Sequence, residues 1–294
     1  ASWGLVLVLW PLLGVGCAHG ERIVTVPDLQ ELIRQEPVPA GHVACAVFDA
    51  DGTLWDFDLS GTLVEQTLEA RRGSDQGLPP LNDLLQTFDL PPAADVHEAL
   101  RALGAAWSSG RLQGIGQQRG WDEQAVSLRV WPSYNWLYLG RSPAELAVQA
   151  RLLLQEQKYQ TRIFAGVRSL VTSLRAAGFR VLVISAGVHE FVQAATTDLG
   201  FAPAEVRGLQ VAVQDGRLTP QVLEPIPYMQ GKAVIARQLC GGKPMYAFGD
   251  SVASGDAALL ELAAFPVAVK PHGRHRQAAR QRGMRMLEHP AGPP

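Results

Sequence analysis

The stretch Phe48-Asp49-Ala50-Asp51-Gly52-Thr53-Leu54 decides the fold. It completes the apolar run His42 to Phe48 (HVACAVF), whose length and composition are typical of a buried strand. Two aspartates leave this strand two positions apart, and Gly52 permits a sharp turn of the chain. We therefore expect two carboxylates near one point at the carboxyl end of a core strand. An ordinary strand-to-helix loop, in which Asp51 caps the helix, would carry the same residues.

Apolar runs alternate with helical patterns along the chain outside residues 59–160. Strands are predicted at Arg180–Ser185, Met245–Phe248 and Pro266–Lys270, and a hairpin over Leu209–Leu218 turns at Asp215-Gly216. Helices are predicted at residues 28–35, 167–177, 188–199 and 231–239. This alternation indicates an α/β fold with a parallel sheet, helices on both faces, and ligands bound beyond the carboxyl ends of the strands.

Residues 59–160 interrupt this pattern because they contain no convincing strand. Their apolar residues recur at helical spacing, as in Leu81, Leu84 and Leu85, and Gly and Pro separate the segments. The sequence therefore predicts a core formed by residues 21–58 and 161–294, with a mainly α-helical domain inserted at residues 59–160.

Residues 1–20 contain no Lys, Arg, Asp or Glu and predict a targeting segment. The run Trp3 to Val15 has the length of a signal-peptide apolar region and is too short to span a bilayer reliably. Gly16-Cys17 after it resembles a bacterial lipobox, although Gly14 stands where that pattern usually has Leu. We expect an exported protein, periplasmic or anchored in the membrane through a lipid on Cys17. There are two alternatives for residues 1–20: a signal peptide that is cleaved without lipidation, and an apolar segment of a cytoplasmic protein.

Composition excludes several classes of protein. The 294 residues are 47% hydrophobic and 18% charged, with a net charge of -2, so neither a disordered chain nor a nucleic-acid-binding surface is expected. Three cysteines without a CxxC pair argue against a disulfide framework and against structural zinc. Cys45 and Cys240 would be two thiols of an exported protein, and the sequence leaves open whether they pair.

Asp-x-Asp-Gly-Thr-Leu after an apolar strand resembles the first motif of the haloacid dehalogenase-like superfamily of phosphohydrolases. Later segments resemble its other motifs in order: Ser185 at the end of RVLVIS, Lys232 at a helix start, and Gly249-Asp250-Ser251 after MYAF. Taken singly, Ser185 also suits a helix N-cap and Lys232 a solvated surface position. The resemblance implies a Rossmann-like core, and the long insert after the first motif is similar to the helical cap of the phosphoserine-phosphatase-like branch.

The resemblance implies a role for each matched residue. Asp49 is expected to attack phosphorus and form an aspartyl-phosphate, while Asp51 protonates the leaving group and then activates water. Ser185, with the adjacent Ala186, is expected to bind the phosphoryl oxygens, and Lys232 to screen the negative charge. The second carboxylate, Asp51, distinguishes phosphatases from dehalogenases in this family and favours phosphate ester hydrolysis.

The resemblance also implies a Mg²⁺ site, because Mg²⁺ prefers oxygen ligands. The expected ligands are Asp49, the carbonyl of Asp51, and Asp250. The fourth motif departs from the family pattern after Asp250, because Ser254 falls where a second acid often sits and the next acid is Asp256. Either Asp256 serves as the second acid, or Ser254 takes its place through water.

The insert carries the candidates for substrate recognition. Asp58 lies nine residues beyond Asp49, where the branch has an acid, usually Glu, close to the substrate amine. A solvated loop acid is the alternative for Asp58. An aromatic group in the insert can either bind a quaternary ammonium through cation–π contact, as in phosphocholine, or form the insert's own core: Trp107, Trp121, Trp131, Tyr134, Trp136 and Tyr138. No arginine is singled out for a substrate carboxylate among Arg71, Arg72 and Arg111.

The preferred interpretation is a magnesium-dependent phosphomonoester hydrolase acting on a small phosphorylated metabolite, phosphoserine-like, through an aspartyl-phosphate. A phosphocholine or phosphoethanolamine phosphatase, or a phosphotransferase, is the enzymatic alternative. An exported binding protein with a silent site is the alternative from another class. Intact Asp49, Asp51, Ser185, Lys232 and Asp250 argue against a silent site. No nucleic-acid partner is expected, and the oligomeric state is left open.

Overall fold

A computed structural model of the chain describes residues 21–288 and residue 290. The expected signal or lipoprotein segment at residues 1–20, including Cys17, lies outside the described residues. Among the residues that are described, no helix is long and apolar enough to cross a membrane.

The core is a seven-stranded parallel sheet in the order β1-β9-β8-β7-β2-β3-β4, which confirms the predicted α/β class. Its strands are β1 (Arg22–Val24), β2 (His42–Phe48), β3 (Arg180–Val188), β4 (Val206–Leu209), β7 (Lys243–Gly249), β8 (Phe265–Val269) and β9 (Arg285–Leu287). Strand β2 lies between β7 and β3, and Phe48 at its end pairs with Val183 and Phe248. The carboxyl ends of these three strands therefore meet at one edge of the sheet.

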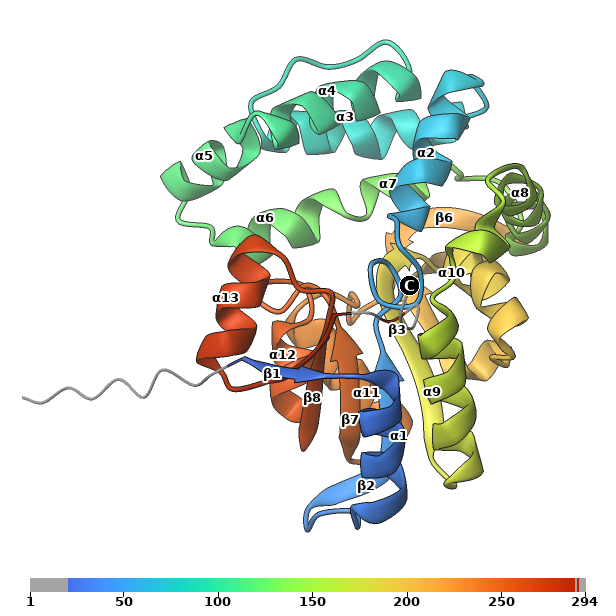
Figure 1. Cartoon of the computed structure of the whole chain (residues 1–294). Helices are drawn as coiled ribbons and strands as arrows, with labels where there is room; N and C mark the ends of the chain where they lie inside the picture. Colours follow the sequence, from blue (N-terminus) through green and yellow to red (C-terminus); the bar gives the residue numbers. More distant parts are fainter. Residues whose placement is uncertain (1–20, 289, 291–294) are drawn as a thin grey trace, which may run out of the picture.

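Helices cover both faces of the sheet, as the alternation predicts (Figure 1). They are α1 (Val26–Gln35), α9 (Ala165–Ala176), α10 (His189–Thr196), α11 (Gln230–Cys240), α12 (Ala257–Leu262) and α13 (Gly273–Gln281). Alternate residues of β2 enter two separate apolar clusters: Phe48 packs with α1 and α9, and Val47 packs with α11 and α12. Burial on both faces explains why the second half of β2, Cys45–Phe48, is wholly apolar.

The insert between β2 and β3 is helical. It contains α2 (Leu59–Glu69), α3 (Leu78–Thr87), α4 (Val96–Ser108), α5 (Arg111–Gln118), α6 (Glu123–Val130), α7 (Ser133–Trp136) and α8 (Pro143–Glu156). We call α2–α8 the cap. Figure 1 shows α3–α6 above the end of the sheet from which α2 leaves. The domain boundaries expected at 58/59 and 160/161 stay a prediction.

The predicted hairpin joins the cap to the core. Strands β5 (Val211–Gln214) and β6 (Arg217–Val222) are antiparallel and turn at Asp215-Gly216. Its Leu218 exchanges backbone hydrogen bonds with the chain before α8: Gly140 N donates to Leu218 O at 2.9 Å, and Leu218 N donates to Arg141 O at 2.8 Å. The hairpin differs from its predicted bounds, because Leu209 ends β4 and β6 continues past Leu218 to Val222. Strand β3 also continues past Ser185 to Val188, so α10 begins only at His189.

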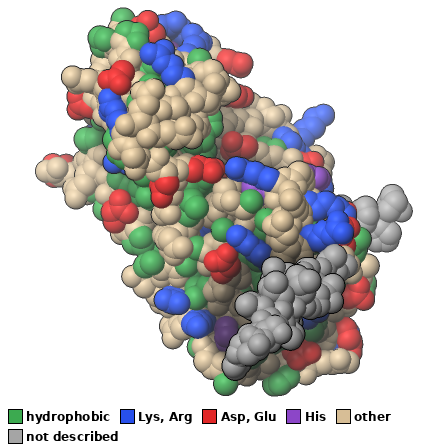
Figure 2. Space-filling model, turned by 90° about the vertical axis from the view of Figure 1, so that its left-hand side faces the viewer, with side chains coloured by type: hydrophobic (Ala, Val, Ile, Leu, Met, Phe, Trp, Pro, Cys, Tyr) green, Lys and Arg blue, Asp and Glu red, His purple; other side chains and the backbone are tan. Residues whose placement is uncertain are grey.

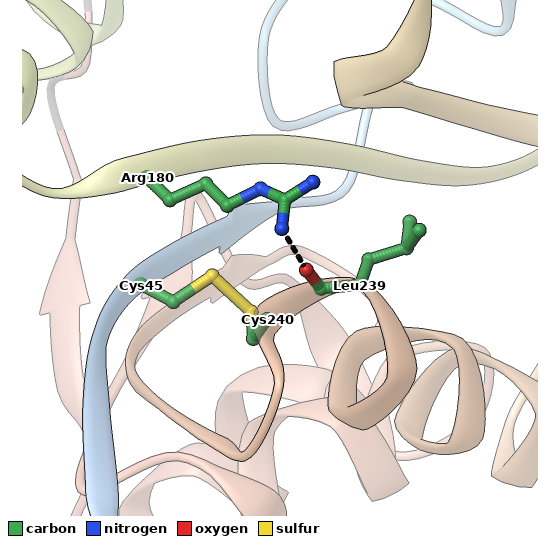
Figure 3. Close-up of a disulfide and its surroundings, with 4 residues drawn as sticks. All are labelled: Cys45, Arg180, Leu239 and Cys240. Carbon is green, nitrogen blue, oxygen red and sulfur yellow. Dashed lines mark hydrogen bonds between the residues drawn. A yellow bond between two sulfur atoms is a disulfide. The ribbon is translucent and has the colours of Figure 1, made fainter.

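Cys45 of β2 and Cys240 of α11 form a disulfide, which answers the question that the sequence leaves open (Figure 3). Beside it, Arg180 of β3 donates a hydrogen bond to the carbonyl oxygen of Leu239. The bond joins two elements that lie 195 residues apart in sequence. On the face of the molecule shown in Figure 2, acidic and basic side chains are interspersed.

Candidate active site

A cavity of about 350 Å³ lies at the carboxyl ends of β2, β3 and β7. All of the sequence-predicted site residues line it: Asp49, Asp51, Asp58, Ser185, Ala186, Lys232, Asp250 and Asp256. The cap contributes Trp131 and Tyr134 to the same cavity. Segments from both ends of the chain therefore meet there because adjacent parallel strands direct the loops that follow them to one edge.

Lys232 holds two carboxylates in the floor of the cavity. Its Nζ lies 2.5 Å from Asp49 Oδ1 and 2.5 Å from Asp256 Oδ1, and all three side chains are buried. Asp256 is further fixed by Ser251 N, which donates to Oδ2 at 2.9 Å. Burial alone would lower the pKa of Lys232, but the carboxylates of Asp256 and Asp49 outweigh burial and raise it. Lys232 therefore stays charged beside Asp49.

Three acids form a site that fits a divalent cation. Oxygens of Asp49, Asp250 and Asp256 lie within 4.8 Å of one another. Burial raises the pKa of Asp49, and repulsion from Asp256 adds to the rise, although Lys232 opposes it. Gly52 permits this crowding, because its φ is +72° and an added Cβ would lie 2.6 Å from Asp250 Oδ2. Oxygen ligands with excess negative charge suit Mg²⁺.

The carboxylate of Asp51 has partners different from those of Asp49. Its Oδ1 accepts hydrogen bonds from Trp55 Nε1 at 2.6 Å and from Leu59 N at 3.0 Å. Burial raises the pKa of Asp51, and the neighbouring carboxylates of Asp58 and Asp49 add to the rise. A carboxyl group that keeps its proton near neutral pH can serve as a general acid. The Asp51 side chain is outside the three-acid cluster, which leaves only its carbonyl for the metal role expected from sequence.

Ser185 lies near the end of β3, with its side chain buried in the cavity wall. Its Oγ accepts a hydrogen bond from Gly187 N at 3.1 Å. Since that bond uses a lone pair of the hydroxyl, the O–H remains able to donate to a phosphoryl oxygen. Ser60 supports this turn, because its Oγ accepts from Val188 N at 3.0 Å.

The sequence leaves open whether Asp256 or Ser254 takes the place of the second acid of the fourth motif, and the structure brings Asp256 to the three-acid cluster. Its carboxylate belongs to the acid cluster and contacts Lys232. Ser254 is buried beside it but lines neither the cavity nor the cluster in the part of the chain that the structure describes. A loop longer than the family pattern thus still brings an acid to the three-acid cluster.

Asp58 lines the cavity and also begins a helix. It is the N-cap of α2, and its Oδ1 accepts a hydrogen bond from Gly61 N at 2.8 Å. The side chain is exposed and has no ion-pair partner among residues 21–288. Burial, and then the Asp58 carboxylate, raise the pKa of Tyr134 to about 12.

The aromatic residues of the cap divide between the two expected roles. Trp131 and Tyr134 line the cavity, whereas Trp121 packs edge-on against Phe88 and Tyr138 packs against Phe191. The three arginines considered for a substrate carboxylate do not line the cavity: Arg71, Arg72 and Arg111. Arg71 instead pairs with Asp95 at 2.9 Å.

Three residues of the site have no role predicted from the sequence: Thr53, Trp55 and Tyr228. Thr53 donates from Oγ1 to Asp49 Oδ2 at 3.4 Å, and Trp55 donates to Asp51. Thr53 lies within the first motif and Trp55 follows it directly, and these positions are the signal that could have identified them. Tyr228, which lines the cavity just before α11, lies in a stretch without a recognisable pattern.

A family model for haloacid dehalogenase-like hydrolases matches residues 46–261. A phosphoserine phosphatase of Streptomyces coelicolor is 30% identical over 133 residues, which cover 43% of this chain and 31% of that protein, so the match spans about a third of the curated relative.

Solved structures share the fold. A Bordetella pertussis Tohama I protein of unknown function superposes with a TM-score of 0.60 at 21% identity, covering 83% of this chain and 97% of that one. A functionally unknown Anaerococcus prevotii protein does so with a TM-score of 0.60 at 16% identity, covering 92% and 94%. The family match runs from β2 to α12 and includes the whole of the cavity floor. On this evidence, the chain belongs to the haloacid dehalogenase-like hydrolase family.

Proposed function

We propose that the chain is a magnesium-dependent phosphomonoester hydrolase acting on a small phosphorylated metabolite through an aspartyl-phosphate intermediate. The observation that carries this proposal is the contrast between two carboxylates in one cavity. Asp49 lies against Lys232, which suits an anionic nucleophile, whereas Asp51 accepts hydrogen bonds from Trp55 Nε1 and Leu59 N and has no cation in contact among the described residues, which suits a group that gives and takes a proton. Similarity to a phosphoserine phosphatase adds support.

In the first step, an oxygen of Asp49 attacks phosphorus, and the bond from phosphorus to the ester oxygen breaks. Asp51 gives its proton to the departing oxygen, so the alcohol leaves neutral. Ser185 donates a hydrogen bond to a phosphoryl oxygen, and Lys232 stabilises the charge that gathers there.

In the second step, deprotonated Asp51 takes a proton from water, whose oxygen attacks phosphorus. The bond from phosphorus to Asp49 breaks, inorganic phosphate is released, and both aspartates return to their starting states. Bound Mg²⁺, held by Asp49, Asp250 and the Asp51 carbonyl with Asp256 nearby, would supply positive charge to the phosphate.

An assay with an aryl phosphate, with and without Mg²⁺, tests this proposal. We expect turnover that requires Mg²⁺ and that falls by more than about 10³-fold in Asp49→Asn, because an amide cannot act as an anionic nucleophile. Asp215→Asn is the matched control, since Asp215 lies in the β5–β6 turn away from the cavity and Asn tolerates its positive φ. Activity of Asp49→Asn close to that of the control would refute the assignment.

We also infer that the protein works outside the cytosol. The Cys45–Cys240 disulfide supports this, because disulfides persist mainly in oxidising compartments. Labelling denatured protein with a thiol reagent, before and after reduction, compares protein collected from the periplasm with protein retained in the cytosol. Export predicts that Cys45 and Cys240 in the periplasmic protein are labelled only after reduction.

A further inference from the structure

Three aromatic rings from the cap and the core meet in the cavity. Trp131 and Tyr134 belong to the cap, and Tyr228 precedes α11 in the core. The ring centroid of Trp131 lies 5.9 Å from that of Tyr134 and 5.9 Å from that of Tyr228, with interplanar angles of 73° and 57°. All three rings line the cavity, and an aromatic ring that lines a cavity can accept a cation there.

The charge lining the cavity is negative beyond the needs of the reaction. Six carboxylates line it, and Lys232 is the only cationic side chain among the described lining residues. Lys232 contacts Asp49 and Asp256, and a bound divalent cation would offset the remaining charge of the three-acid cluster. Asp51 accepts hydrogen bonds from Trp55 Nε1 and Leu59 N. Asp56 is paired with Arg162 at 2.8 Å. Asp58 is the acid that remains without a positive partner.

We propose that the alcohol portion of the substrate carries an ammonium group and no carboxylate, as in the phosphate esters of choline and ethanolamine. This inference rests on the proposed phosphatase function and names the class of ester that it takes. With the phosphate at Asp49, the ammonium group lies between the aromatic wall and Asp58. Cation–π contact and the opposite charge of Asp58 both favour that placement.

Among the described residues that line the cavity, no unpaired cation matches a carboxylate on the alcohol. Lys232 forms ion pairs with Asp49 and Asp256 in the floor of the cavity, so it is not free to pair with a substrate carboxylate. Arg162 does not line the cavity, and its guanidinium lies 3.8 Å from the Phe57 ring centroid and pairs with Asp56. A carboxylate would therefore lie near Asp58 without a cation, which disfavours phosphoserine relative to phosphoethanolamine.

The decisive experiment compares kcat/KM of the Mg²⁺-loaded full chain for five esters. They are phosphocholine, its neutral carbon isostere 3,3-dimethylbutyl phosphate, phosphoethanolamine, phosphoserine and an aryl phosphate. A desolvated cation–π contact predicts that phosphocholine exceeds its isostere by about 30-fold, and phosphoethanolamine should exceed phosphoserine. Equal values for phosphocholine and its isostere would overturn the inference, as would phosphoserine equal to phosphoethanolamine.

Variants separate charge from structure. Asn caps helices as well as Asp does, so Asp58→Asn removes the charge while retaining the N-cap of α2. We expect it to lower the ratio of phosphocholine to isostere by about 10-fold. Asp122→Asn is the control, because Asp122 caps α6 by accepting from Ala125 N at 2.7 Å and does not line the cavity. A ratio that falls equally in both variants would contradict a role for the Asp58 charge.

The aromatic wall has its own test. Tyr134→Leu should lower the same ratio, whereas Tyr134→Phe, which keeps the ring face, should restore it. Binding of choline alone, followed by tryptophan fluorescence, gives a readout without turnover and should be lost in Trp131→Leu. Saturable choline binding without hydrolysis of any ester would refute the proposed function but keep the ammonium site. Hydrolysis of the aryl phosphate without choline binding would refute only the ammonium site.

Discussion

Asp51 and Asp49 leave the same strand but have different partners, and these partners determine what a substitution should do. In Asp51→Asn, the amide oxygen can still accept from Trp55 Nε1 and Leu59 N, so the loop should keep its shape. The amide cannot protonate a leaving group, and we expect turnover of an alkyl phosphate to fall about 10²–10⁴-fold. An aryl phosphate, whose leaving group needs no proton, should lose less. Single-turnover phosphorylation rates that fall equally for both esters would contradict the acid role.

Individual site residues could be predicted where a short motif contains them. Asp49, Asp51 and Lys232 follow from their motifs, and the structure places them in one cavity. Tyr228 could not be predicted, because its place beside Trp131 depends on how the cap lies over the core. The choice between Ser254 and Asp256 likewise depends on the path of a loop, which residue spacing alone does not determine.

At the level of helices and strands, the buried core strands match the prediction, whereas the two three-residue strands were not predicted. Strand β2 is found at its predicted bounds, because a strand buried on both faces has a continuous apolar run. Strands β1 and β9 have three residues each and pair with one another, Ile23 with Met286. Three residues cannot show a periodicity, and pairing across most of the chain has no local pattern. Helix α13 was also missed, since Ala279 is its one fully buried residue.

The disulfide links the strand that ends at Asp49 to the helix that carries Lys232. Because it closes a loop of 195 residues, removing it should destabilise the folded state through the greater entropy of the unfolded chain. We expect the double variant Cys45→Ala/Cys240→Ala to lose about 2–5 kcal/mol of unfolding free energy in urea. A reductant should shift the midpoint of the wild type and leave that of the variant unchanged. A variant with the midpoint of the oxidised wild type would show that the bond contributes nothing.

His189, the first residue of α10, makes stability depend on pH. Its Nδ1 accepts from Gly208 N at 3.1 Å, while burial, and then Arg207, lower the pKa of His189 to about 4. As pH falls below about 6.5, this histidine becomes protonated in the unfolded state, whereas in the folded state it stays neutral until pH approaches 4. The free energy of unfolding therefore falls over this pH range. We expect a loss of about 2 kcal/mol between pH 7 and pH 4.5 from this group. His189→Asn retains an acceptor without the titration and should flatten this part of the pH profile; an unchanged slope would contradict the assignment.

For the molecule as a whole, the order of the parts could be predicted but not their packing. The lack of strand patterns between the first two motifs predicts a helical insert, and the cap is helical. Which cap residues face the cavity was left open, because helical spacing identifies an apolar face but not what covers it. Trp131 and Trp121 are both tryptophans of the insert and have the same two expected roles, yet of the two only Trp131 lines the cavity in the described structure.

The folded molecule brings together acids that the unfolded chain keeps apart, and this links metal binding to stability. Asp49, Asp250 and Asp256 repel one another within 4.8 Å, whereas the unfolded chain has no such cluster. Mg²⁺ should therefore bind the folded state alone. At 100 times its Kd it should add about 2.7 kcal/mol to the free energy of unfolding and raise Tm by about 5–10 °C over a sample in EDTA.

Asp250→Asn should show two opposite changes in thermal unfolding. It removes one of the repelling charges, so its Tm in EDTA should exceed that of the wild type, and it removes a ligand, so Mg²⁺ should raise its Tm far less. Asp215→Asn, away from the cluster, should respond to Mg²⁺ as the wild type does. Wild-type melting curves that coincide in Mg²⁺ and EDTA would mean that these three acids do not form a metal site.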